Sequence, residues 1–148
     1  MDGFKDESTT SLYETDFFSW TQEQAGLIRS GQLDKVDLAN VTEEIETLGR
    51  AERSALMSSY RLICLHQLKR MFQAERSDSR SWTQTIVRER NNVEANLEDN
   101  PGLKPQRQGL FARAYKHARR EAAAETGMAP NGFPVHPPVT LQQIDYET

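Results

Sequence analysis

The stretch over residues 37–72, DLANVTEEIETLGRAERSALMSSYRLICLHQLKRMF, constrains the fold most, because it combines helical periodicity with a long apolar run. Before Gly49, apolar residues recur at helical spacing and form one narrow stripe of Leu38, Val41, Ile45 and Leu48. After Gly49, apolar residues extend almost all round the helix, a pattern typical of a buried core helix. We therefore expect residues 37–72 to form a central helix whose first stripe faces the core, with either a bend or a break at Gly49.

Polar side chains interrupt the apolar stretch on one side only. At 100° per residue, four of them fall within roughly 40° of one another: Glu52, Ser59, His66 and Arg70. Lys69 lies beside His66 in this polar seam. A polar seam on a buried helix is the best candidate for a functional site, although the residue types do not specify a reaction.

The composition indicates one globular domain with a strongly charged surface. The chain has 148 residues, 36% hydrophobic and 27% charged, which is long enough to bury a core and too apolar for a disordered chain. The longest uninterrupted apolar run, residues 62–65, is far too short to span a membrane. The single cysteine, Cys64, lies in that run, and the acidic N-terminus lacks the apolar segment of a secretory signal. We expect a cytoplasmic protein in which Cys64 is a small buried side chain.

Charge is distributed unevenly along the chain. Residues 1–52 carry four basic and twelve acidic side chains, whereas residues 53–120 carry fourteen basic and six acidic ones. Opposite charges of this size favour packing of the acidic segment against the basic one, within a monomer or across a homodimer. A basic face for nucleic acid is the alternative. The acidic isoelectric point of about 5.4 argues against it, so we expect no nucleic-acid binding at physiological salt.

The remaining pattern predicts an all-α, single-domain bundle of four to six helices over residues 12–127. Residues 1–11 lack periodicity and are expected to be disordered, and a Pro-rich tail over 128–148 is expected to run extended over the bundle, docking through Leu141 and Ile144. Predicted helices begin near Asp16, at Trp82 with Ser81 as N-cap, and near Lys104. Their apolar faces are Phe17, Trp20, Gln24, Leu27 and Ile28, then Trp82, Ile86, Val93 and Leu97, then Leu110, Phe111, Ala114, Ala118 and Ala122.

Several segments, in this order and spacing, resemble a bacterial family known as Domain of Unknown Function twenty-nine. The matching segments are LYETDFFSW at 12–20, EEIETLGR at 43–50, HQLK at 66–69, RSDSRSW at 76–82, residues 86–90, LEDNPGL at 97–103, AYKHARREAAAETG at 114–127 and FPVHPPVTLQQI at 133–144. The resemblance covers nearly the whole chain and implies an all-helical single domain without an assigned activity. The family often has a cysteine where this chain has His136, so no role of that cysteine applies here.

His66 is the first candidate for chemistry. Burial and the nearby cations Lys69 and Arg70 would disfavour its protonated form, which suits a neutral base or a ligand. The alternative is a hydrogen-bonded core histidine. Together, Arg61 and His66 match the R-x4-H spacing of helical nucleases, although this spacing arises readily by chance.

Glu44 and Glu46 flank the first apolar stripe on opposite edges and could reach a buried cation. Paired with His66 they could bind a metal, but the Glu-x-x-His motif of helix-bundle metal sites is absent from the sequence. We expect structural ion pairing instead, with at least one of these carboxylates contacting His66, Lys69, Arg80 or Arg90.

A second group combines arginines with one aromatic residue, and such a group suits a phosphate near a helix N-terminus. Its members are Arg76, Arg80, Trp82 and Arg90. The alternative is that these arginines neutralise the acidic segment and that Trp82 belongs to the core. The chain has no phosphate-binding loop, dinucleotide fingerprint or zinc-spaced cysteines, so we expect neither a cofactor nor a metal.

Three function classes follow from these residues. We expect a helical interaction or accessory module without catalysis, with a protein partner or a second copy of the chain. A metal-independent RNA nuclease using Arg61 and His66, assisted by Lys69, is one alternative. A metal-dependent hydrolase using Glu44, Glu46 and His66 is the other.

Overall fold

The chain is all α-helical, as predicted. The computed structural model describes residues 12–73 and 79–146, and within these ranges it contains helices and turns but no strand. The elements after a helical turn at residues 12–15 are α2 (Phe17–Arg29), η1 (Leu33–Lys35), α3 (Leu38–Phe72), α4 (Ser79–Asp99), η2 (Pro101–Gln106), α5 (Arg107–Thr126), η3 (Pro130–Gly132) and α6 (Leu141–Tyr146). The predicted disorder of residues 1–11 and the position of Arg76 lie outside the described ranges.

The central stretch forms one helix, α3, of 35 residues, and Gly49 does not break it. Contacts nevertheless divide the chain into two compact units, Met1–Arg50 and Ala51–Thr148, so the boundary falls within α3. None of the helices in the described ranges combines the length and apolar content that a membrane span requires.

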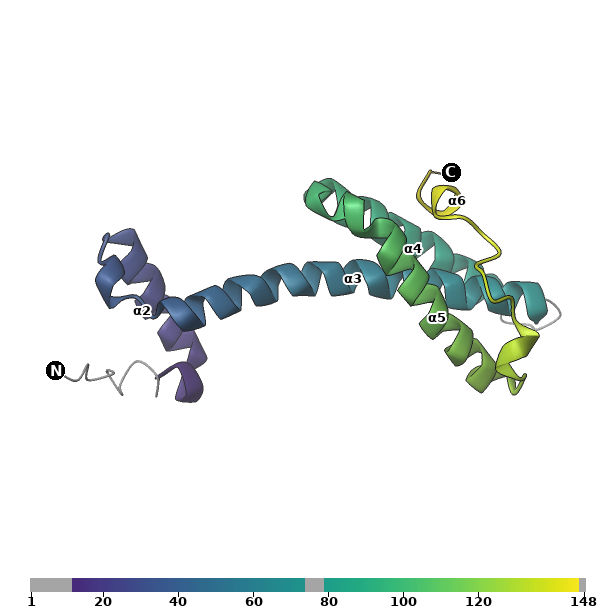
Figure 1. Cartoon of the computed structure of the whole chain (residues 1–148), viewed down its shortest axis with the longest axis horizontal. Coiled ribbons are helices and arrows are strands. Elements are labelled where there is room, and N and C mark those ends of the chain that lie inside the picture. Colours follow the sequence, from purple (N-terminus) through teal and green to yellow (C-terminus); the bar gives the residue numbers. More distant parts are fainter. Residues whose placement is uncertain (1–11, 74–78, 147–148) are drawn as a thin grey trace. The chain divides into compact units, whose positions relative to one another are not determined.

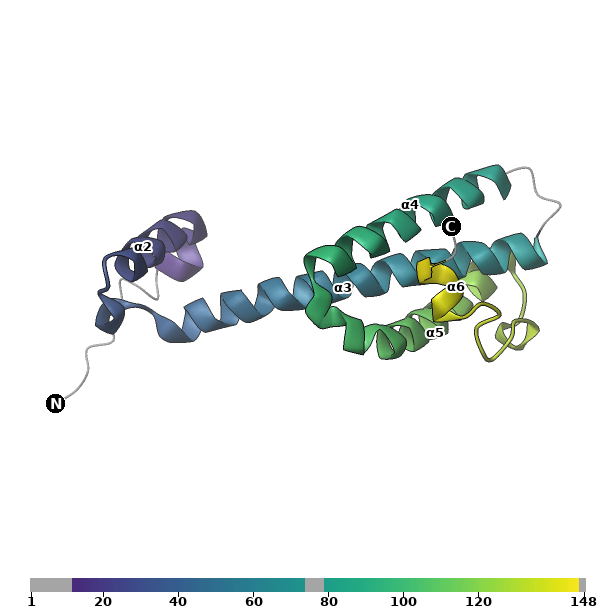
Figure 2. The same cartoon turned by 90° about the horizontal axis from the view of Figure 1, so that it is seen from above.

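The second unit contains the main core. Figures 1 and 2 show α4 and α5 alongside the C-terminal half of α3. The predicted apolar faces of α4 and α5 are buried in this core. From α3, the buried side chains are Leu56, Ser59, Tyr60, Ile63, Cys64, Leu65 and Leu68. The buried central helix is therefore confirmed for this half of α3.

Two helix starts differ from the predictions, each for a local reason. Helix α4 begins at Ser79, one turn of chain before the predicted first residue Trp82, so Ser81 is inside the helix and is not its N-cap. Helix α5 begins at Arg107 because the segment before it, which contains Pro101 and Pro105, forms the 3-10 helix η2. Proline lacks the backbone N–H that a continuous α-helix requires.

The C-terminal tail packs on the second unit. Phe133, Leu141 and Ile144 are buried, which confirms the predicted docking. Thr140 caps α6, because its Oγ1 accepts a hydrogen bond from the backbone N–H of Gln143 at 3.1 Å. The extended tail is thus held by apolar burial and by a local cap.

The first unit is a small helical hairpin. Asp16 caps α2 by accepting the backbone N–H of Ser19 at 3.1 Å, and Trp20, with Gln24, is buried on the face of α2 toward α3. The Gln24 Oε1 accepts the backbone N–H of Asp37 at 2.7 Å, which links the two arms of the hairpin. The chain reverses direction through Gly31, whose φ of 77° favours glycine.

Candidate functional site

The N-terminal part of α3 carries an exposed apolar surface. Leu38, Ile45 and Leu48 are 64%, 63% and 69% exposed, and Val41 beside them is half-buried. We call these four residues the α3 stripe. The prediction that this stripe faces the core is wrong. Within the first unit, Val41 and Glu44 are half-buried and Glu44 is bonded to Tyr13, whereas the other three residues of the stripe are uncovered.

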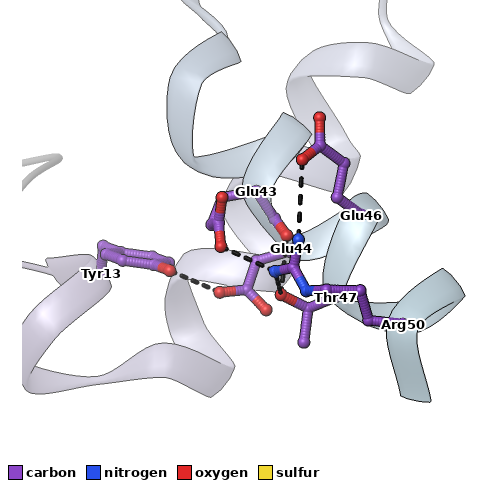
Figure 3. Close-up of polar contacts among 6 residues, drawn as sticks. All are labelled: Tyr13, Glu43, Glu44, Glu46, Thr47 and Arg50. Carbon is purple, nitrogen blue, oxygen red and sulfur yellow. Dashed lines mark hydrogen bonds and ion pairs between the residues drawn. The ribbon is translucent and has the colours of Figure 1, made fainter. Parts of the chain in front are cut away.

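Polar groups next to the α3 stripe bond with one another, as Figure 3 shows. Tyr13 donates a hydrogen bond to Glu44, and this bond raises the pKa of the Tyr13 hydroxyl. Arg50 lies 2.8 Å from the carboxylate of Glu43 and 3.7 Å from that of Glu46. The side chains of Arg50, Glu43 and Glu46 are all about half exposed, so these ion pairs contribute little to the stability of the fold.

Both glutamates have partners inside the first unit. Glu44 is bonded to Tyr13 and Glu46 to Arg50. The predicted pairing did not consider a cation one helical turn away, although its spacing is visible in the sequence. For Glu46 that cation is Arg50, at the i+4 position.

Two cations in the second half of α3, Arg61 and the seam residue Lys69, pair with carboxylates of α5. Arg61 Nη1 lies 2.8 and 2.7 Å from the two carboxylate oxygens of Glu121, and Lys69 forms an ion pair with Glu125. Lys69 Nζ also lies 5.7 Å from the ring centroid of Trp82. These cations therefore connect α3 to α5 and α4.

His66 has a local partner. Its Nδ1 lies 2.8 Å from the backbone oxygen of Leu62, and the side chain is half-buried. A ring nitrogen facing a carbonyl oxygen carries the proton, so Nδ1 donates here. This hydrogen bond fixes the orientation of the ring, and Arg61 is engaged separately with Glu121.

The members of the predicted arginine group make separate contacts. Arg90 donates from Nε to the backbone oxygen of Ile144 at 3.0 Å and from Nη2 to that of Gln143 at 3.2 Å, which anchors α6. Trp82 is 5% exposed and belongs to the core, whereas Arg80 is exposed. Glu89 of α4 is 6% exposed and accepts a hydrogen bond from Arg88 Nε at 3.4 Å.

The sequence did not predict a polar cluster around Asp145. Its side chain is 3% exposed, and its Oδ2 accepts from Arg107 Nη1 at 2.8 Å. The Tyr60 hydroxyl lies 3.2 Å from both carboxylate oxygens. Burial raises the pKa of Asp145, and Arg107 opposes this shift. The only available signal was a tyrosine in the most apolar part of α3, because a contact between residues 85 positions apart does not show in the spacing of the sequence.

A metal centre has no support among the residues placed by the structure. Within them, His, Cys, Asp and Glu side chains form no group of three that could hold a metal ion. Glu44, Glu46 and His66 are instead engaged separately with Tyr13, Arg50 and the Leu62 carbonyl.

Cys64 is predicted to be unreactive in the folded protein. It is 2% exposed, and burial raises the pKa of its thiol to about 12. Because the thiolate is the nucleophile, alkylation by iodoacetamide at pH 8 should be at least about tenfold slower in native buffer than in denaturant. Mass spectrometry of the alkylated protein over time measures both rates. Equal rates would place Cys64 at an accessible position and contradict the packing of α3.

The fold and site together define an all-α protein with a second-unit core and a small first-unit hairpin that exposes an apolar stripe. The family model described as "Domain of unknown function DUF29" matches residues 12–147, so the chain belongs to this family. Among solved structures, it is similar to an alpha-helical protein of unknown function from Rhodospirillum rubrum ATCC 11170, with 28% identity and a TM-score of 0.60. The match covers 91% of this chain and 89% of that chain. No curated protein matches the chain significantly.

Proposed function

We propose that the protein is a non-catalytic helical interaction module that binds a protein partner through the α3 stripe. The observation that carries this proposal is the exposure of Leu38, Ile45 and Leu48, each above 60%, at helical spacing on one helix. An amphipathic helix presents its apolar residues at this spacing when it binds a partner groove or helix.

The physical reason is the free energy of burial. Covering a Leu or Ile side chain stabilises a complex by roughly 1.5–3 kcal/mol relative to leaving it in water. The polar groups beside the stripe, Glu44 and Glu46, already have partners in Tyr13 and Arg50. A partner could therefore cover the stripe without burying an unpaired carboxylate in the interface.

The catalytic alternatives have weaker support. Arg61, which the nuclease hypothesis needs free for RNA, binds both carboxylate oxygens of Glu121. A basic nucleic-acid surface is likewise weakened by the use of Arg90 and Lys69 in internal contacts. We place the protein in the bacterial cytoplasm, a reducing compartment in which a single thiol such as Cys64 remains unpaired.

Site-specific photo-crosslinking in the producing cells tests the proposal. A photoreactive phenylalanine analogue at position 45 should give a discrete protein adduct, because Ile45 lies in the stripe. The same analogue at position 47 is the matched control, since Thr47 is exposed and lies about 160° away on the helix. Adducts at both positions, or at neither, would contradict the proposal. RNA cleavage by the purified protein that is lost in His66→Ala would contradict its non-catalytic part.

A further inference from the structure

Resting on the interaction function proposed above, we propose that the partner is a second copy of this chain. Two α3 stripes pair antiparallel about a two-fold axis near residue 43, and the two first-unit hairpins form a helical bundle. The reasons are the small core of the first unit, the symmetry of the stripe and the apolar area that the hairpin leaves exposed.

The first unit buries too little apolar surface to form a core of its own. Among residues 12–50, the only buried side chains are Trp20, Gln24 and Val36. By contrast, seven of its large apolar side chains are exposed: Phe17, Phe18, Ile28, Leu33, Leu38, Ile45 and Leu48. A segment of this size needs more burial to offset its ordering entropy, and oligomerisation is one common source.

The spacing of the stripe is self-complementary. Leu38, Val41, Ile45 and Leu48 follow one another at intervals of three, four and three residues, as the a and d positions of a coiled coil do. This series of intervals reads the same in both directions. An antiparallel second helix therefore places Leu48 of the partner subunit opposite Leu38, and Ile45 of the partner subunit opposite Val41.

Helix α2 adds exposed apolar side chains to the first unit. At 100° per residue, Phe17 and Ile28 lie on one flank of the buried α2 face that carries Trp20 and Gln24. They are 48% and 46% exposed, so they add to the apolar surface that the first unit leaves uncovered.

The exposed apolar area can be compared with the area that a stable dimer buries. Phe17, Ile28 and the α3 stripe together expose on the order of 500 Å² of apolar surface, given that one aromatic side chain buries about 150–250 Å². A standard interface buries about 800 Å² per partner, of which about 65% is apolar in homodimers. The apolar surface that the first unit leaves exposed is therefore of the same order as the apolar share of one such interface.

Electrostatics gives this dimer a distinctive salt dependence. Residues 12–50 carry eight acidic and three basic side chains, so two first units repel each other. Salt screens this repulsion, and dimerisation should strengthen as salt rises. If the acidic unit instead bound the exposed cations of α5 in a second copy, Arg113, Lys116 and Arg120, association would weaken with salt.

Sedimentation equilibrium of the full chain tests the proposal. The wild type should be a dimer whose dissociation constant falls as salt rises from about 50 to 500 mM, because the electrostatic screening length shortens over this range. Ile45→Glu should raise the dimer dissociation constant at least tenfold, and the matched control Thr47→Glu should leave it within about twofold. Circular dichroism must show unchanged helicity in both variants, because position 45 is exposed and its substitution should not unfold the chain.

Disulfide trapping tests the orientation. In the double variant Leu38→Cys with Leu48→Cys, oxidation should link position 38 of one copy to position 48 of the other. Links of 38 to 38 and 48 to 48 would overturn the antiparallel arrangement. A monomeric wild type overturns the dimer, and if position 45 still crosslinks to another protein in cells, the interaction function stands without it. If position 45 gives no adduct, the interaction function fails as well.

Discussion

Leu65→Ala is expected to lower the free energy of unfolding by about 2–5 kcal/mol. Leu65 is 3% exposed and belongs to the continuous apolar core formed by α3, α4 and α5. The substitution removes buried methyl groups and leaves a cavity, since close-packed neighbours relax only in part. Urea denaturation followed by circular dichroism measures the change.

The matched control for this prediction lies on the same helix. Met71 is 52% exposed, so Met71→Ala should change the free energy of unfolding by no more than about 0.5 kcal/mol. A loss below about 1 kcal/mol for Leu65→Ala, or equal losses for the two variants, would mean that the second half of α3 is peripheral.

The helices of the second unit were largely predictable because their apolar residues are buried in one continuous core. Ile86, Val93 and Leu97 recur at helical spacing, and all three are buried in the structure. The same holds for Ala114, Ala118 and Ala122 of α5, whose small side chains let neighbouring helices approach closely. Gly127, with a φ of 75°, ends α5 in the left-handed conformation that glycine adopts readily.

The first part of α3 shows where periodicity stops being informative. Leu38, Ile45 and Leu48 have a spacing as regular as that of Ile86 and Val93, yet they are exposed. Periodicity indicates that a helix has an apolar face, but it does not indicate what covers that face. Gly49 was ambiguous for a similar reason, because an isolated glycine weakens a helix without ending it.

The polar contacts were less predictable than the core. Local pairs follow from spacing, as Glu46 and Arg50 do at i and i+4. Distant pairs do not, and Tyr13 and Glu44 are separated by 31 residues. Charge bias correctly indicated that α3 cations need acidic partners, but those of Arg61 and Lys69 came from the acidic residues of α5 rather than from the acidic N-terminal segment.

Asp145→Ala is expected to lower the free energy of unfolding by about 2–4 kcal/mol, because it removes a buried partner of a charged group. The carboxylate of Asp145 is 3% exposed and accepts from Arg107, whose side chain is 23% exposed. Without it, the Arg107 guanidinium keeps its desolvation cost and loses its ion pair. Urea denaturation at neutral pH measures the loss.

A double-mutant cycle separates the ion pair from general packing. Arg107→Met keeps the apolar stem of the side chain and removes the charge. Combined with Asp145→Ala, it should cost less than the sum of the two single variants by at least about 1 kcal/mol, since neither partner is then left alone. Additivity within about 0.5 kcal/mol would show that the two groups act independently.

The pH dependence of Asp145→Asn gives the same cluster a second test. Burial raises the pKa of Asp145 above its ordinary value of 3.8, against the opposing effects of Arg107 and Tyr60. A carboxyl group with a raised pKa in the folded state binds its proton more tightly there than in the unfolded chain. The stability that this tighter proton binding adds is therefore fully present below pH 3.8 and is lost as the pH rises through the raised pKa, whereas the ion pair with Arg107 remains at neutral pH. Asparagine does not titrate, so the stability of the wild type relative to Asp145→Asn should fall over this pH range. The contributions of the other carboxyl groups cancel, because both proteins contain them. A constant difference from pH 3 to pH 7 would show that Asp145 has the same pKa in both states, and that its burial does not disfavour the charged form.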